Sequence, residues 1–294
     1  MSRPKISIAS PVYNGERYLE LALDSVLSQT FSDFELIITD NASTDRTEEI
    51  CRRYAAGDRR IRYIRNERNL GVVANFNLGF ELARGEYFRW HCYDDLMAPR
   101  CLEQCLEPME ADPSLAVCQA LTDLIDENGR RLEMFETERE LDSPEPHARF
   151  WSMLWTRCFP PIFGLMRSEL VAKTKLFPHY VGADRYFLAE LLLLGGLRYV
   201  RECLFSIRVH PGAYRLQGTT PEVRRQWYTP GGRRLPAFMQ MPVSCWAFAT
   251  TACRARVSWS QKVRCLGHVG SWTAHETWAI ARRRFGHRRQ PAIA

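Results

Sequence analysis

The 294-residue sequence contains no apolar run of the roughly 18 residues that a membrane-spanning helix needs. Its nearest approach, residues 188–197, is too short and includes Glu190. The ten cysteines form no C-x-x-C pair and no Cys/His cluster with zinc spacing, which argues against a zinc-binding module. The first residues lead straight into a strand-like segment without a signal-peptide pattern, so we expect a cytoplasmic protein with reduced thiols.

Acidic residues are scarce in the last third of the chain. Residues 198–294 hold 17 Lys and Arg against 3 Asp and Glu, a net charge of +14, whereas residues 1–197 hold 23 against 31, a net charge of −8. Such a basic stretch is either a solvated face or the contact surface for an anionic partner. A membrane surface and a protein partner stay open, but no nucleic-acid-binding motif accompanies the charge, so we expect no nucleic-acid partner.

The first half of the sequence alternates between strand and helix patterns. Continuous apolar runs at 34–39 and 115–121 are typical of strands buried on both faces, and apolar residues recur at helical spacing over 17–29. This order predicts an α/β fold with a mostly parallel sheet flanked by helices. The other predicted elements are strands at 6–9, 61–64, 86–91, 162–166 and 204–209, and helices at 45–55, 72–83, 100–109, 184–194 and 238–285.

Polar residues follow three of the predicted strands and precede helices. These segments are Ser10 to Glu16, Asp40 to Asp45, and the adjacent carboxylates Asp94 and Asp95. Open α/β sheets bind ligands at the carboxyl ends of their strands. The three segments should therefore line one edge of the sheet.

Three stretches carry a resemblance to a known family. SPVYNGERYLELALDSVLSQT, FELIITDNASTDRT and NLGVVANFNLGFELARGEYFRWHCYDDLMAP resemble glycosyltransferase family 2, whose members have the GT-A nucleotide-sugar fold. The resemblance covers residues 5–125 strongly and 160–210 more weakly. It implies an inverting transfer of a sugar from a nucleotide-diphosphate donor to a glycan or lipid-linked acceptor.

The resemblance also suggests a division of the chain. Residues 1–210 would form the GT-A domain, with a nucleotide-sugar half at 1–125 and an acceptor half at 126–210. Residues 211–237, which are rich in proline and glycine, are predicted to be a flexible loop. The helical pattern predicts a basic helical extension over 238–294, which is either a solvated face or, with its tryptophans and arginines, a contact with an anionic membrane surface that would make the protein peripheral on the inner face.

By this resemblance, the donor would be held by residues from the ends of the first, second and fourth predicted strands and from the helix that begins near Gly71. The Tyr13 ring can stack on a nucleobase, and Asp40 can accept the imide N–H of uracil or thymine, which favours a UDP- or dTDP-sugar. The implied donor-binding residues are Pro11, Tyr13, Asn14, Glu16, Asp40, Asn41, Asn75 and Asp94.

The resemblance further implies a metal ion and a general base. Asp95, with Asp94 and His210, would hold Mg²⁺ or Mn²⁺, which prefer hard oxygen ligands. Cys92 departs from the family, where many members have a further Asp, and a thiol is a poor Mg²⁺ ligand. Asp184, in a segment similar to that of the family's catalytic base, would take the proton of the acceptor hydroxyl, and the helix N-terminus would favour its ionised form.

Each of these residues also has an ordinary structural interpretation. Asp40 and Asp184 are good helix N-caps, and the Asp94–Asp95 pair is compatible with a plain turn. His210 suits a loop and Tyr13 suits a core. Two other functions stay open: a non-catalytic sugar-nucleotide-binding protein of the same fold, and a sugar nucleotidyltransferase, although the latter should have a glycine-rich loop where this chain has SPVYNGE.

Overall fold

A computed structural model of the chain describes residues 3–134, 141–156, 160–179, 182–212 and 240–286. In this part of the chain the strands form one nine-stranded sheet, with the order β3-β2-β1-β4-β8-β6-β9-β5 and with β7 paired to β6. The strands are β1 (Ile6–Val12), β2 (Phe34–Asp40), β3 (Ile61–Arg65), β4 (Tyr87–Trp90), β5 (Leu96–Met97), β6 (Leu115–Ile125), β7 (Arg131–Met134), β8 (Leu165–Arg167) and β9 (Gly196–Arg208).

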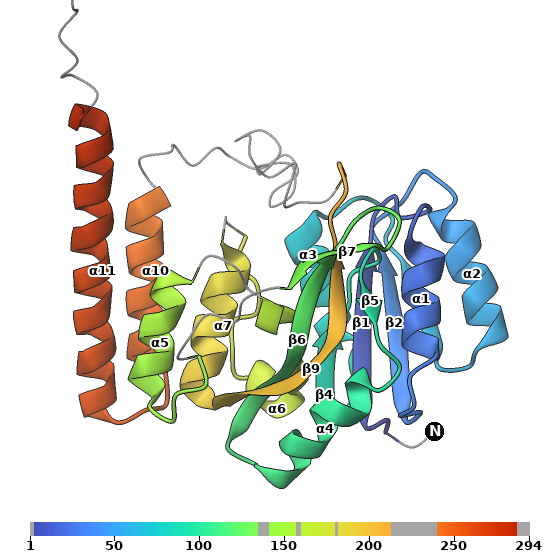
Figure 1. The fold of residues 1–294 in the computed structure, drawn as a ribbon, viewed down its shortest axis with the longest axis horizontal. Coiled ribbons are helices and arrows are strands. Elements are labelled where there is room, and N and C mark those ends of the chain that lie inside the picture. Colours follow the sequence, from blue (N-terminus) through green and yellow to red (C-terminus); the bar gives the residue numbers. More distant parts are fainter. Residues whose placement is uncertain (1–2, 135–140, 157–159, 180–181, 213–239, 287–294) are drawn as a thin grey trace, which may run out of the picture.

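Helices cover both faces of this sheet (Figure 1). A short 3₁₀ helix, η1 (Pro160–Phe163), precedes β8. The α-helices are α1 (Leu19–Leu27), α2 (Thr47–Gly57), α3 (Val72–Glu81), α4 (Cys101–Ala111), α5 (Pro146–Trp155), α6 (Ser168–Val171), α7 (Ala183–Leu194), α10 (Gln240–Arg254) and α11 (Trp259–Gly286).

The N-terminal half of the sheet is parallel, as the apolar runs predict. Strand β1 pairs in parallel with both β2 and β4, and β2 pairs in parallel with β3. Every residue of β1 and β2 is buried, because helices pack on both faces of a parallel sheet. The fold predicted from sequence, α/β with a mostly parallel sheet and flanking helices, is therefore observed.

Side chains of β4 alternate between two hydrophobic clusters. Phe88 and Trp90 belong to the cluster beneath α3 and α7, whereas Tyr87 belongs to the cluster beneath α1 and α4. Helix α3 approaches β1 closely, since a Cβ atom at Gly79 would lie 2.7 Å from the Cβ of Ala9. Strand β4 therefore lies between two layers of helices, with successive side chains pointing to opposite faces of the sheet. The polar residues Asp94 and Asp95 come after its carboxyl end.

Two sequence predictions in the second half are corrected by the structure. The strand expected at 162–166 is limited to β8, because Pro160–Phe163 form the 3₁₀ helix. Strand β9 begins at Gly196, well before the expected residue 204, because parallel pairing with β6 extends the strand through residues that are partly exposed. Helix α5 was not predicted at all.

The helices α10 and α11 confirm the helical prediction for the C-terminal region, with a break between them. They stack on α5 and α7 at one side of the sheet (Figure 1). Phe248, Cys265 and Trp272 are buried there in the same cluster as α5 and α7. The loop predicted at 211–237 lies outside the described residues from 213 onward. None of the described helices combines the length and the hydropathy needed to cross a membrane.

Candidate functional site

The carboxyl ends of β1, β2 and β4 lie at one edge of the sheet because the three strands are parallel neighbours. Val12 is opposite Asp40 in the β1–β2 register, and the backbone N–H of His91 donates to the Ala9 carbonyl at 2.9 Å. Helix α7 ends where β9 begins, at the amino end of β6. The start of α7, with Asp184, is therefore at the same edge as the three strand ends (Figure 1).

The turn after β1 is bound to the turn after β2. Asn14 has φ 52°, and its side-chain Oδ1 accepts the backbone N–H of Thr44 at 2.9 Å. Glu16 Oε2 accepts the backbone N–H of Arg46 at 3.0 Å. Pro11 is buried within β1, whereas the Tyr13 ring is 44% exposed. The ring of Tyr13 is thus open to a ligand, and the structure does not use it as core packing.

Asp40 is fully buried at the end of β2 and has several donors. Its Oδ1 accepts the Ser43 backbone N–H at 2.9 Å, and its Oδ2 accepts the Tyr63 hydroxyl at 2.7 Å. The Arg65 Nε lies 3.5 Å from the same Oδ2. Burial and the hydrogen bond to Asp40 raise the pKa of Tyr63. The carboxylate keeps unused lone pairs for a nucleobase N–H, but its side chain is 0% exposed, so a ligand reaches it only if the turn around it moves.

Asn41 and Asn75 belong to a network of four asparagines that holds the segment before α3. The Asn41 Nδ2 donates to Asn69 Oδ1 at 2.9 Å. Asn66 Nδ2 donates to both Asn41 Oδ1 and Asn75 Oδ1, at 3.2 and 3.0 Å. The Nδ2 of Asn75, which is buried, donates to the Thr39 carbonyl at 2.8 Å. The network fixes the edge around β2, and sequence reasoning missed Asn66 although it lies in an asparagine-rich stretch.

Asp94 and Asp95 are held by Arg208, the last residue of β9, and by His210 just after it. The backbone N–H of Arg208 donates to Asp95 Oδ1 at 3.0 Å, and its Nε donates to the Asp94 carbonyl at 2.9 Å. The Nε2 of His210 lies 3.0 Å from Asp94 Oδ2. Tyr18 packs against both partners, 4.8 Å from the His210 ring and from the Arg208 guanidinium. The turn after β4 thus carries two adjacent carboxyl groups with basic residues beside them.

Burial strongly affects the chemistry of this acidic pair. Asp95 is 3% exposed, and its burial and the charge of Asp94 raise its pKa well above the usual range, against the opposing effect of Arg208. A divalent cation would reverse this effect by stabilising the ionised form. Cys92 contributes a third donor, since one ligand atom from each of Cys92, Asp94 and Asp95 all lie within 4.8 Å of one another. The donors of these three residues are close enough to hold a divalent metal ion, whereas His210 contacts Asp94 but is not part of this group.

Asp184 is the second residue of α7, after Gly182, which has φ 85°. Its Oδ1 accepts the backbone N–H of Arg185 at 2.9 Å. Burial raises the pKa of Asp184 and outweighs the lowering by backbone N–H groups that the helix N-terminus provides. The backbone N–H groups at the start of α7 do lower the pKa of Asp184, as expected, but burial raises it by more. Among the described residues no hydrogen bond joins Asp184 to the acidic pair.

The family model for glycosyl transferase family 2 matches residues 7–174 of this chain. An uncharacterized glycosyltransferase of Methanocaldococcus jannaschii is 37% identical over 141 residues, which are 47% of this chain and 49% of that protein. For three curated relatives the matched stretch covers between 49% and 65% of the relative's length, so the chain spans about half to two thirds of them.

Solved structures share the fold. Staphylococcus aureus TarS 1–349 in complex with UDP-GlcNAc has a TM-score of 0.67 at 18% identity, covering 91% of this chain and 72% of that one. The mannosyltransferase PcManGT of Pyrobaculum calidifontis, in complex with GDP-Man and Mn²⁺, has a TM-score of 0.55 at 18% identity, covering 96% and 86%. The sheet and its flanking helices are those of the GT-A fold, and the chain belongs to glycosyltransferase family 2.

Proposed function

We propose that this protein is a metal-dependent, inverting glycosyltransferase that moves a sugar from a UDP- or dTDP-sugar to a hydroxyl of a glycan or lipid-linked acceptor. The observation that carries the proposal is the Asp94–Asp95 pair, bound to Arg208 and His210 at the edge where the turns after β1 and β2 also lie. The neighbours with the same fold are described in complex with nucleotide sugars, which supports a donor of that class.

The metal, Mg²⁺ or Mn²⁺ in this proposal, would be held by Asp95 with Asp94 and His210. When bound there, such an ion would supply positive charge to stabilise a leaving nucleotide diphosphate. Arg208 keeps both aspartates in place through its backbone N–H and its guanidinium. Its guanidinium also donates to the carbonyls of Asp126 and Glu127, at 3.1 and 3.2 Å, which ties the end of β6 to the same centre.

The donor would lie across the ends of β1 and β2. In this proposal the exposed Tyr13 ring stacks on the base, Pro11, Asn14 and Glu16 shape the turn beneath the ribose, and Asp40 accepts the base N–H. Asn41 and Asn75 would hold the segment before α3 against the donor through the asparagine network. Asp184 would act as the base toward the acceptor hydroxyl, since a pKa raised by burial makes a carboxylate a better proton acceptor.

The test of the donor and metal site is thermal unfolding against UDP-, dTDP-, GDP- and CMP-sugars, with and without Mn²⁺. We expect the melting temperature to rise for a UDP- or dTDP-sugar only when the metal is present, because a ligand at 100 times its Kd stabilises the folded state by about 2.7 kcal/mol. Asp95→Asn, which keeps an acceptor for the Arg208 N–H, should abolish the rise.

The matched control is Asp33→Asn, an exposed carboxylate at the amino end of β2. It should leave the rise unchanged. A rise that survives in Asp95→Asn would contradict the role given to the acidic pair, and a rise with GDP- or CMP-sugars alone would contradict the role given to Asp40.

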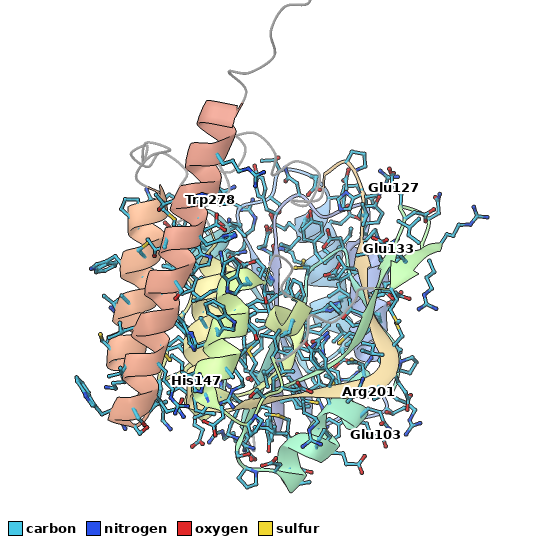
Figure 2. The ribbon with its side chains drawn as sticks, turned by 60° about the vertical axis from the view of Figure 1, so that its left-hand side comes forward. Glu103, Glu127, Glu133, His147, Arg201 and Trp278 are labelled. Carbon is cyan, nitrogen blue, oxygen red and sulfur yellow. The ribbon has the colours of Figure 1, made fainter. Side chains whose placement is uncertain are left out.

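We also propose that the chain is cytoplasmic, that residues 1–210 form the transferase domain with its halves at 1–125 and 126–210, and that residues 238–294 contact an anionic membrane surface. Trp259 and Trp278 on α11 are 78% and 58% exposed. Figure 2 shows Trp278 on the side of the molecule away from Glu127 and Glu133. Exposed indoles on a helix poor in acidic residues suit the interface of anionic lipid.

Replacing both Trp259 and Trp278 by Ser should weaken co-sedimentation with anionic vesicles by about tenfold or more, since burying one large apolar side chain is worth about 1.5–3 kcal/mol. Point variants are preferable to removal of α10 and α11, which would expose the cluster beneath them. Leu132→Ser is the control, because Leu132 is also exposed, at 54%, but belongs to strand β7 and not to the C-terminal helices. Equal binding of all variants would refute the membrane proposal.

A further inference from the structure

Cys92 places a sulfur atom beside the acidic pair. It follows β4 by two residues, is partly buried, and its Sγ lies within 4.8 Å of a carboxylate oxygen of both Asp94 and Asp95. Two ligands of one metal ion are at most twice the metal–ligand distance apart, which is about 4.0–4.6 Å for Zn²⁺ with sulfur and oxygen ligands. In tetrahedral coordination the ligand atoms lie about 3.3–3.8 Å apart, so side-chain movements of up to about an ångström would bring all three donors onto one ion.

We infer that Cys92 is a direct ligand of the metal at this centre and makes the centre select thiophilic divalent ions, such as Co²⁺, Zn²⁺ and Cd²⁺, over Mg²⁺. The inference rests on the proposed function, because it uses the same metal position. Binding through sulfur would require the Cys92 thiol to release its proton to solvent, and the ion would remain divalent.

The donor set decides this preference. Mg²⁺ takes hard oxygen ligands and keeps several waters, whereas thiolate selects softer ions and imidazole suits transition metals. Here one sulfur accompanies two carboxylates, and the imidazole of His210 lies 3.0 Å from Asp94 Oδ2. A sulfur that replaces an oxygen in the small space around the ion removes a favourable Mg²⁺ contact and adds one that a thiophilic ion prefers.

The alternative is that Cys92 is only a small side chain that fills the end of β4. In that case the sulfur never bonds to the ion, and substitution by Ser or Asp changes neither the spectrum of bound Co²⁺ nor the order of metal affinities. The two interpretations differ in an optical signal that does not depend on turnover, because only thiolate ligation gives a sulfur-to-cobalt charge-transfer band.

The experiment titrates the full-length, metal-free protein with Co²⁺ and then competes the bound ion with Mg²⁺. We expect a charge-transfer band in the near ultraviolet that is lost in Cys92→Ser and Cys92→Asp. In Cys92→Asp the ratio of the Mg²⁺ to the Co²⁺ dissociation constant should fall on the order of tenfold or more, since a hard oxygen replaces the sulfur. Cys203→Ser, at an exposed thiol on β9, is the control and should keep the band.

Two results would overturn the inference. The first is a charge-transfer band that persists in Cys92→Ser, which would mean that another cysteine is the thiolate ligand. The second is Co²⁺ binding to the wild-type protein that calorimetry detects but that gives no band, which would mean that Cys92 does not bind the metal. In the second case a Mn²⁺-dependent rise in melting temperature with a nucleotide sugar would leave the proposed function standing. If no divalent ion binds in either assay, both the inference and the metal dependence fail.

Discussion

Asp184→Asn is expected to lower kcat by about 10²–10⁴-fold, the usual contribution of a positioned general base, while the affinity for the nucleotide sugar stays within experimental error. The amide keeps an oxygen that can accept the Arg185 N–H, so the start of α7 should be preserved. It removes only the ability to take a proton from the acceptor hydroxyl. Single-turnover transfer, with donor binding followed separately by thermal shift, measures the two effects independently.

The pH profile gives this prediction a second readout. Burial raises the pKa of Asp184, and the ionised form is the one that accepts a proton. In the wild-type protein kcat should therefore fall as the pH drops through that raised pKa, at a higher pH than an exposed aspartate would give. The residual activity of Asp184→Asn should lack this acidic limb.

The control for Asp184 is Glu169→Gln, an exposed carboxylate in the first turn of α6. It changes the charge at a helix N-terminus but lies in a different element. Equal turnover of the wild-type protein and Asp184→Asn would assign the base to another residue and leave Asp184 as an N-terminal helix residue. Loss of donor affinity together with turnover would indicate a role in binding instead.

Phe248→Ala is expected to lower the free energy of unfolding by about 3–5 kcal/mol, the range for removing a buried aromatic ring. Phe248 is fully buried on α10, with ring contacts to Phe150, Tyr186 and Trp272 at 6.0, 4.7 and 5.6 Å between centroids. These partners come from α5, α7 and α11. The ring therefore joins the C-terminal helices to the rest of the domain, and its loss leaves a cavity between four elements.

Urea unfolding followed by circular dichroism and by tryptophan fluorescence measures this effect and also tests whether one transition describes both probes. Trp246→Ala on the same helix is the control, because Trp246 is 62% exposed and surface substitutions usually change stability by less than about 0.5 kcal/mol. A loss below about 1 kcal/mol in Phe248→Ala would mean that α10 and α11 contribute little to the stability of the domain.

The acidic pair Asp94–Asp95 could be predicted from the sequence, but its partners could not all be predicted. Asp94 and Asp95 stand out because two charges follow the buried strand that contains Phe88 and Trp90, and that pattern is local. The partner of Asp95 is not local, since Arg208 is 113 residues away. The family resemblance singled out His210, and the structure does bring it to Asp94. The resemblance did not predict that Arg208 donates hydrogen bonds to both aspartates, from its backbone N–H and from its guanidinium.

Other residues were recognised by their position but not by their contacts. Asn41 and Asn75 were expected to touch the donor, and their contact with a ligand stays a prediction. What the structure adds is that their amides bind Asn66, Asn69 and the Thr39 carbonyl. Such a network depends on which loops meet after folding, and no spacing rule in the sequence encodes that meeting.

The sequence by itself determined the α/β class, the edge at which the polar strand ends gather, and the acidic pair, because continuous apolar runs and turn residues act over a few neighbouring positions. Only the tertiary structure decided that β9 extends along β6, that α10 and α11 share a core with α5 and α7, and that Arg208 and His210 reach Asp94 and Asp95. These contacts depend on the order of strands in the sheet and on packing between distant helices. Both are properties of the folded chain as a whole.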